Sequence, residues 1–269
     1  MDINDTKRNK QCKFTIEEEK QIISEYLKGD GTTILGRRYQ VDPITIHNIL
    51  KAYKIQTRTL KEARNTKIKI NEQVFNPKYD NPSMAYWLGV MYSDGYLSCV
   101  NKYTAKFGIA VQQSDIEWLR QFKQYLEYNG KIHTYIQTQG FGTGTPYARL
   151  LIGNNSIVQD LKNWGMQEKK SLKPTHIPDT KHKLNFIYGY IDGNGSIHKK
   201  NHTLFISGEK TILQDIANYL QLPYHIYDDK SIGNLSYSPL NAKIIYNHIL
   251  SLNCKYGLQR KLDLMSINQ

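Results

Sequence analysis

The chain has 269 residues and a formal net charge of +12, with 36 lysines and arginines against 24 aspartates and glutamates. Hydrophobic residues make up 39% of the sequence, which supplies a core and excludes wholesale disorder. No apolar run approaches the roughly 18 residues that a membrane-spanning helix requires. The polar, acidic start of the chain is unlike a signal peptide. The excess of positive charge suggests a polyanionic partner, for which nucleic acid is the usual case. Charge alone fits a basic protein without such a partner about equally well, and an anionic membrane surface is a third option.

Cysteines are few and far apart, at positions 12, 99 and 254. Their number is odd, and no pair has the close spacing of a zinc site or of a redox motif. We therefore expect free thiols in a reducing compartment. The expected location is intracellular, either cytoplasmic or nucleoid-associated and not secreted, with an organelle or a phage-infected host as the alternatives.

Residues 14–56 predict three short helices. Thr15 and Glu18 have the spacing of a capping box at the start of the first helix. A second helix fits Thr33–Tyr39. Asp42, followed by a proline, is a suitable N-cap for the third.

Three short helices with a tight turn before the last resemble helix-turn-helix modules of the resolvase or homeodomain-like type. The polar face of the third helix suits contacts in the DNA major groove. A small helical bundle that binds protein, or nothing, is the alternative, but basic residues around the third helix favour DNA. The DNA contacts expected here are Arg37, Arg38, Thr45, His47, Asn48 and Lys51.

The segments on either side of these helices lack periodicity. Residues 1–13 are polar and charged, and we expect a flexible arm. Residues 57–81 are basic and predict a linker. This linker either follows the phosphate backbone of DNA or serves as a solvated tether.

The remainder of the chain contains an internal repeat. Residues 84–98 read MAYWLGVMYSDGYLS and residues 184–198 read LNFIYGYIDGNGSIH. Each motif is followed by two strands, an amphipathic helix, a hairpin and a closing helix, which predicts one repeat over 82–172 and a second over 173–269. At an offset of 100 residues, Gly89, Ser93, Asp94 and Gly95 align with Gly189, Gly193, Asn194 and Gly195.

Both motif helices are almost entirely apolar, so we expect both to be buried. Each carries two small residues four positions apart, Gly89 with Ser93 and Gly189 with Gly193. Residues at this spacing share one helix face, and small side chains there let two backbones approach closely. The repeat therefore predicts two helices packed against each other about a pseudo-two-fold axis.

Asp94 lies in the last turn of its helix, before a glycine cap. A carboxylate is unfavourable there, because the helix C-terminus already carries partial negative charge, and a bound cation would offset this cost. Two such helix ends side by side would gather acidic and carbonyl oxygens from Asp94, Asn194, Ser93 and Gly193. We expect them to hold Mg²⁺, or Mn²⁺, and such ions drive phosphodiester hydrolysis.

These motifs resemble those of the LAGLIDADG homing endonucleases in their single-chain form with two motifs. The match lies in Trp87–Gly95 and Ile187–Gly195 and, with the flanking elements, covers about residues 82–269. The resemblance implies an α+β fold with two pseudo-symmetric αββαββα halves, whose sheets form a saddle over the DNA major groove. It also implies that the acidic residue in the eighth motif position of each half binds metal.

One of these acidic positions departs from the family pattern, because the second motif has Asn194 where the first has Asp94. The amide oxygen can coordinate a cation but lacks the charge. Asp192 does not replace the missing acid, because the resemblance gives its position a structural role. Three activities are compatible with this pattern: a weak double-strand cutter, a strand-biased nickase, or a DNA-binding protein without cleavage. The substitution could be natural or engineered.

Gln112 resembles the polar residue that orients water near the metals in this family, and the corresponding Ser207-Gly208-Glu209 is a weaker match. The expected catalytic residues are therefore Asp94, Asn194 and Gln112. The family often has a basic residue before the closing helix, but here those positions read Asn154-Asn155 and Ser238-Pro239. Lys230 is only a loose candidate for this role.

The leading hypothesis is a monomeric endonuclease, intron-encoded or free-standing, that cuts double-stranded DNA at a long asymmetric site. A transcriptional regulator on the same scaffold and an RNA-binding intron maturase are the alternatives. A membrane partner is not expected. The polar strand faces expected to contact DNA carry Lys106, Gln112, Tyr135, Gln137, Arg149, Lys199 and Lys200.

Overall fold

The computed structural model describes residues 13–59, 62, 68–101, 104–138, 142–168, 173–229 and 232–266. Nearly all of the predicted N-terminal arm, and the candidate Lys230, lie outside these residues. The chain divides into two compact units, residues 1–69 and residues 70–269. Each unit is described by itself below.

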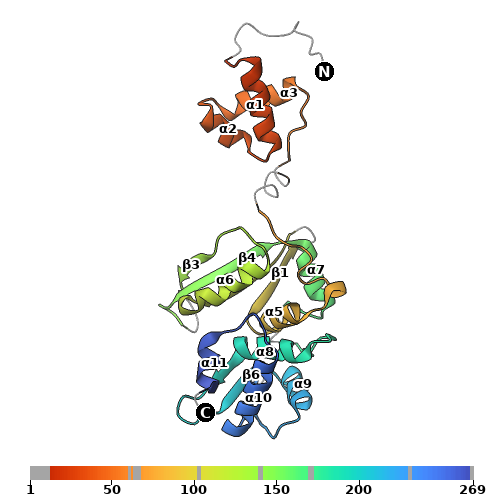
Figure 1. Cartoon of the computed structure of the whole chain (residues 1–269), viewed down its shortest axis with the longest axis vertical. Coiled ribbons are helices and arrows are strands. Elements are labelled where there is room, and N and C mark those ends of the chain that lie inside the picture. The colour runs from red at the N-terminus through yellow and green to blue at the C-terminus, as the bar shows by residue number, and fades with distance from the viewer. Residues whose placement is uncertain are drawn as a thin grey trace. The chain divides into compact units, whose positions relative to one another are not determined.

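The small unit consists of α1 (Ile16–Leu27), α2 (Thr32–Arg38) and α3 (Pro43–Ala52) (Figure 1). The predicted capping box begins α1: the Glu18 amide donates to Thr15 Oγ1 at 3.3 Å, and the Thr15 amide donates to Glu18 Oε2 at 2.8 Å. Asp42 caps α3 by accepting the Ile44 amide at 2.8 Å. The apolar side chains that are fully buried between the helices are Ile22, Leu35, Ile46 and Leu50.

Arg58, which was expected in the linker, packs on the C-terminal end of α1 instead. Its guanidinium donates to the carbonyl oxygens of Tyr26, Gly29 and Asp30 at 2.7, 3.1 and 2.6 Å. It also lies 4.0 Å from the centroid of the Tyr26 ring. The Tyr26 carbonyl belongs to the last turn of α1 and already accepts the Gly29 amide at 3.0 Å, and the other two carbonyls follow the helix. A cation is favoured there, because the C-terminal end of a helix carries partial negative charge. The packed part of the small unit therefore continues past the predicted boundary at residue 56.

The large unit contains two halves with the same order of elements (Figure 1). The first half comprises α5 (Pro82–Ser93), β1 (Gly95–Asn101), β2 (Thr104–Gln112), η3 (Gln113–Asp115), α6 (Ile116–Tyr125), β3 (His133–Ile136), β4 (Pro146–Gly153) and α7 (Asn155–Asn163). The second comprises α8 (Lys183–Asn194), β5 (Gly195–Ile197), β6 (Leu204–Glu209), α9 (Lys210–Leu220), β7 (His225–Asp229), β8 (Ile232–Tyr237) and α10 (Pro239–Ser251).

Each half has one antiparallel sheet, with strand order β1-β2-β4-β3 in the first and β5-β6-β8-β7 in the second. The predicted alternation in β2 is confirmed, since Phe107, Ile109 and Val111 are buried. Equivalent strands share a register: Gly95 pairs with Ile109, and Gly195 pairs with Ile206. The predicted α+β fold with two repeated halves is therefore confirmed.

Besides the 3-10 turn η3, two further elements were not expected from the sequence. A 3-10 turn, η2 (Pro77–Tyr79), precedes α5, and a helix, α11 (Gln259–Ser266), follows α10. We had expected the closing helix of the second repeat to be the last element. The short α11 matters for the site described below, because it packs near β5 and α10 of the second half.

The motif helices α5 and α8 lie side by side at the centre of the large unit (Figure 1). A Cβ atom added to Gly89 would overlap the carbonyl oxygen of Phe186, and one added to Gly189 would overlap that of Tyr86. The predicted close approach through small residues is therefore confirmed. Over the part of the chain that the structure describes, no helix combines the length and apolar character needed to cross a membrane.

Candidate functional site

The C-terminal ends of α5 and α8 converge. Asp94 is the C-cap of α5, with its amide 2.9 Å from the Val90 carbonyl oxygen, and Asn194 is the last residue of α8. A Cβ atom on Gly193 would overlap the Ser93 side chain and would lie 3.2 Å from Asp94 Oδ2. The Asp94 carboxylate of one half therefore lies against the helix end of the other.

The groups at the converging helix ends that could coordinate a metal ion are hard oxygens. The Ser93 hydroxyl donates back into its own helix, to the carbonyl oxygens of Gly89 and Val90 at 3.2 and 3.0 Å. The Asn194 amide nitrogen lies 3.5 Å from the Tyr190 hydroxyl. Among the described residues, no three His, Cys, Asp or Glu side chains gather to hold a metal. One carboxylate with an amide and backbone carbonyls fits a weakly bound Mg²⁺ or Mn²⁺ ion.

Lys261, which no motif in the sequence singled out, reaches the same helix end from α11. Its side chain is 5% exposed. The ammonium group donates to the carbonyl oxygens of Ile191, at 3.1 Å, of Asp192, and of Gly193, at 3.2 Å. Burial lowers the pKa of Lys261 to about 8, although the negative charges of Asp192 and Asp94 oppose this effect.

Asp192 points away from the converging helix ends into the core, in keeping with the structural role expected for it. Its Oδ2 atom accepts the Tyr86 hydroxyl at 2.6 Å and the Leu258 amide at 2.9 Å. The Tyr86 hydroxyl in turn accepts the Trp118 indole N–H at 2.7 Å. Burial raises the pKa of Asp192 to about 6, against the lowering effect of these hydrogen bonds and of Lys261.

The segment that carries Lys261 is attached to both halves of the large unit. Arg260 forms a two-pronged ion pair with Asp115 of the first half, at 2.8 and 2.7 Å. The Gly257 amide lies 3.3 Å from the Gln121 side-chain oxygen, also in the first half. Lys261 itself bonds α8 of the second half. These contacts fix the position of the ammonium group.

The strand register makes Glu209 the counterpart of Gln112. Gly95 pairs with Ile109 and Gly195 pairs with Ile206, and Gln112 and Glu209 each end their strand three positions after that partner. Gln112 is exposed. Glu209 accepts the amides of Thr175 and Thr211 at 3.1 and 3.0 Å. Burial alone would raise the pKa of Glu209, but the hydrogen bonds from these amides outweigh it and lower the pKa.

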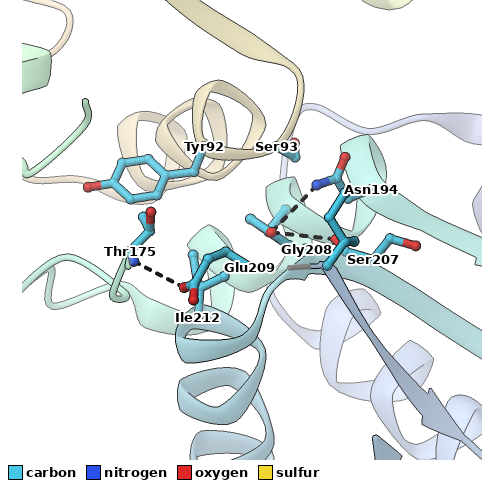
Figure 2. A pocket seen from close by; sticks show the side chains of 10 residues that line it. Tyr92, Ser93, Thr175, Asn194, Ser207, Gly208, Glu209 and Ile212 are labelled. Carbon is cyan, nitrogen blue, oxygen red and sulfur yellow. Dashed lines mark hydrogen bonds between the residues drawn. The ribbon is translucent and has the colours of Figure 1, made fainter. Parts of the chain in front are cut away.

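Glu209 and Asn194 line the same pocket of about 270 Å³, at the join between the two halves (Figure 2). Ser93 and Tyr92 contribute the wall from α5, and Thr175 and Ser207 come from the second half. The pocket therefore connects the end of β6 with the converging helix ends. Nothing comparable was expected from the sequence, because the match at Ser207-Gly208-Glu209 was weak.

Four of the predicted DNA contacts share one face of the first sheet: Lys106, Gln112, Tyr135 and Arg149. Arg149 is exposed and lies 5.2 Å from the centroid of the Tyr135 ring. Gln137 follows the end of β3. Lys199 and Lys200 are exposed in the turn between β5 and β6, beside the second sheet. The structure thus gathers four of the seven contacts on one strand surface.

On the small unit, the predicted contacts Arg37, His47, Asn48 and Lys51 are exposed, and Thr45 is half-buried. Arg38 differs from them, because its guanidinium forms ion pairs with Glu25 at 2.6 Å and with Asp30 at 2.8 Å. These pairs hold Arg38 on α1. Contact with DNA would therefore compete with two existing partners.

No protein-family model matches the sequence, and a comparison with curated proteins finds no match. Solved structures do resemble the chain. The LAGLIDADG meganuclease I-AabMI bound to uncleaved DNA is 16% identical, with 68% of this chain and 88% of that chain covered and a TM-score of 0.45. The LAGLIDADG homing endonuclease I-GzeII with its DNA target is 13% identical, with 69% and 87% covered and a TM-score of 0.47.

A third similar structure is the homing endonuclease I-WcaI bound to its DNA recognition sequence. It is 15% identical, with 81% of this chain and 92% of that chain covered and a TM-score of 0.46. These likenesses concern the fold. Independently of them, the large unit has the paired motif helices and the repeated αββαββα order that the resemblance of the motifs implied.

Proposed function

We propose that this protein is a site-specific endonuclease that hydrolyses phosphodiester bonds of double-stranded DNA with a divalent metal ion, Mg²⁺ or Mn²⁺. The observation that carries the proposal is the convergence of two helix C-termini, with the Asp94 carboxylate against Gly193. Both helix ends carry partial negative charge, and a carboxylate adds to it. This concentration of negative charge suits a divalent cation.

In this proposal Asp94 and Asn194 hold the ion, together with the backbone carbonyl of Ser93. The Gly193 carbonyl, which the sequence also suggested as a ligand, already accepts the Lys261 ammonium group at 3.2 Å. The ion, when bound, lowers the pKa of a water molecule and offsets negative charge on the scissile phosphate. Gln112 accepts and donates hydrogen bonds and so orients water at the end of β2. The oxygens that hold the ion lie on two helices locked together at their glycines, which keeps them preorganised.

DNA binding is assigned to the strand faces and to the small unit. Arg149 and Lys106 suit phosphate contacts, while Gln112 and the aromatic Tyr135 suit base edges. The exposed face of α3 would add contacts as a helix-turn-helix module. The two sheets carry different side chains, so a monomer of this chain would recognise a long asymmetric site. Binding should weaken steeply as salt is raised.

Cleavage is proposed to be weak or biased toward one strand, because Asn194 lacks the charge of an aspartate. The same feature suits a transcriptional regulator that binds DNA without cutting. An RNA-binding maturase is the less favoured alternative, because an exposed α3 face suits duplex DNA. A cleavage assay separates the cutting activities from the regulator, and competition by RNA tests the maturase.

The test is cleavage of supercoiled plasmids that carry DNA flanking the gene, with Mg²⁺ or Mn²⁺. Parent protein, Asp94→Asn and Asn194→Asp are compared, with Asp179→Asn as a control that removes a charge from an exposed site. Cutting should vanish in Asp94→Asn and persist in the control. Nicked circles that become linear with Asn194→Asp would identify a nickase.

Tight binding without cutting by any variant would contradict the endonuclease and leave the regulator. Competition by structured RNA, measured on the same DNA complex, tests the maturase. Strong displacement by RNA at a concentration where unrelated DNA has no effect would favour it.

A further inference from the structure

The end of α8 already holds a cation that belongs to the protein. The last carbonyls of a helix have no partner within the helix and form its negative pole. In α8, the carbonyls of residues 191–193 all accept hydrogen bonds from the Lys261 ammonium group. An ammonium group has three donors, so this contact uses all of them.

Lys261 differs in its burial from an ordinary surface lysine at a helix end. Lys261 is almost completely buried, and a buried ammonium group is costly unless it is paired and hydrogen-bonded. Asp94 and Asp192 both attract it. Two residues just before Lys261 are anchored as well: Arg260 to Asp115, and the Leu258 amide to Asp192. The segment that precedes Lys261 therefore holds the ammonium group in place.

The two helix ends thus differ in charge as well as in sequence. The α5 end carries the Asp94 carboxylate, whereas the α8 end carries the neutral Asn194 and the Lys261 ammonium. A divalent ion on the α8 side would face a fixed positive charge, and it would have to compete with Lys261 for the Gly193 carbonyl. On the Asp94 side, an ion would be attracted by a full negative charge.

We propose that Lys261 is a tethered cation that occupies the electrostatic place of a second divalent ion, so that each chain binds one ion, held by Asp94, instead of two. The inference rests on the proposed function only in taking the converging helix ends as the metal site. It explains why Asn194 is tolerated there: a second carboxylate is not required when the cation is covalently attached.

The test is the number of Mn²⁺ ions bound per full-length chain, measured by electron paramagnetic resonance of free Mn²⁺ during titration. The parent should bind one ion, and Asp94→Asn should bind none. Asn194→Asp should still bind one, because the fixed charge of Lys261 at the α8 end repels a second ion. Asn194→Asp combined with Lys261→Gln should bind two.

Two ions bound by the parent, or by Asn194→Asp alone, would overturn the inference and leave Lys261 as a helix cap only. One ion in the double variant, or none in the parent, would also overturn it. If Lys261→Gln does not fold, the Asn194→Asp measurement still decides, because that variant keeps the lysine. Loss of plasmid cleavage with the expected ion numbers would refute the proposed function and leave this inference intact.

Discussion

Replacing Gly189 by alanine tests the crossing of the motif helices. Alanine in a helix interior is favoured over glycine by about 1 kcal/mol. Here, however, the new methyl group would overlap the Tyr86 carbonyl oxygen, which is backbone and cannot rotate away. Overpacking costs about 1–3 kcal/mol and occasionally more. Since the overlap is with backbone, we take the upper end and expect a net loss of about 2 kcal/mol or more.

Urea unfolding followed by tryptophan fluorescence measures this loss, because all three tryptophans lie in the large unit. A loss of this size would lower the melting temperature by roughly 4–8 °C. Gly153→Ala is the matched control, since its new Cβ atom would find its nearest neighbour, the Ala105 carbonyl oxygen, at 3.9 Å. A Gly189→Ala protein as stable as this control would refute the predicted overlap.

Three further predictions concern other contacts. Tyr86→Phe removes the donor 2.6 Å from buried Asp192 and should lower the free energy of unfolding by about 1–3 kcal/mol in urea titration; an unchanged midpoint would contradict this. Arg58→Ala removes three carbonyl contacts and should speed hydrogen exchange in α1 without changing tryptophan unfolding of the large unit. Arg149→Ala should weaken DNA binding and reduce the salt slope by about 1, and an equal slope would argue against a phosphate contact.

The paired motif helices could be predicted because their signal is local and physical. Glycine and serine four residues apart on an apolar helix give one helix face with small side chains. The repeat supplies a second such face, and the two can pack closely against each other. The structure places Gly89 and Gly189 at that contact, each against backbone of the other helix. The strands followed in the same way from alternation, since a period of two specifies which face is buried.

Lys261 could not be predicted as readily, because its role depends on contacts between segments far apart in the chain. Its only local signal is a lysine on the same helical face as Leu258 and Met265, which are both buried. A cation on an apolar stripe is a reason to look for a buried acceptor. Nothing in the spacing, however, names the carbonyls at the end of α8 as that acceptor.

Glu209 is a second residue whose role could not be read from the local sequence. Its sequence neighbourhood matched Gln112 poorly, but the strand register makes the two positions equivalent. The first half therefore combines an acid at the helix end with an amide at the strand end, and the second half reverses them. In the second half the acid, Glu209, accepts hydrogen bonds from the Thr175 and Thr211 amides.

Among the described residues, Asp94 therefore supplies a carboxylate at the end of α5, whereas the end of α8 carries an ammonium group. The backbone repeats with two-fold symmetry, but the charges do not. A DNA duplex offers chemically similar phosphates on its two strands, so equal treatment of both would require equal charge at both helix ends. The asymmetry of Asp94 and Lys261 is thus a physical reason to expect unequal cutting of the two strands, over and above the loss of one acid at Asn194.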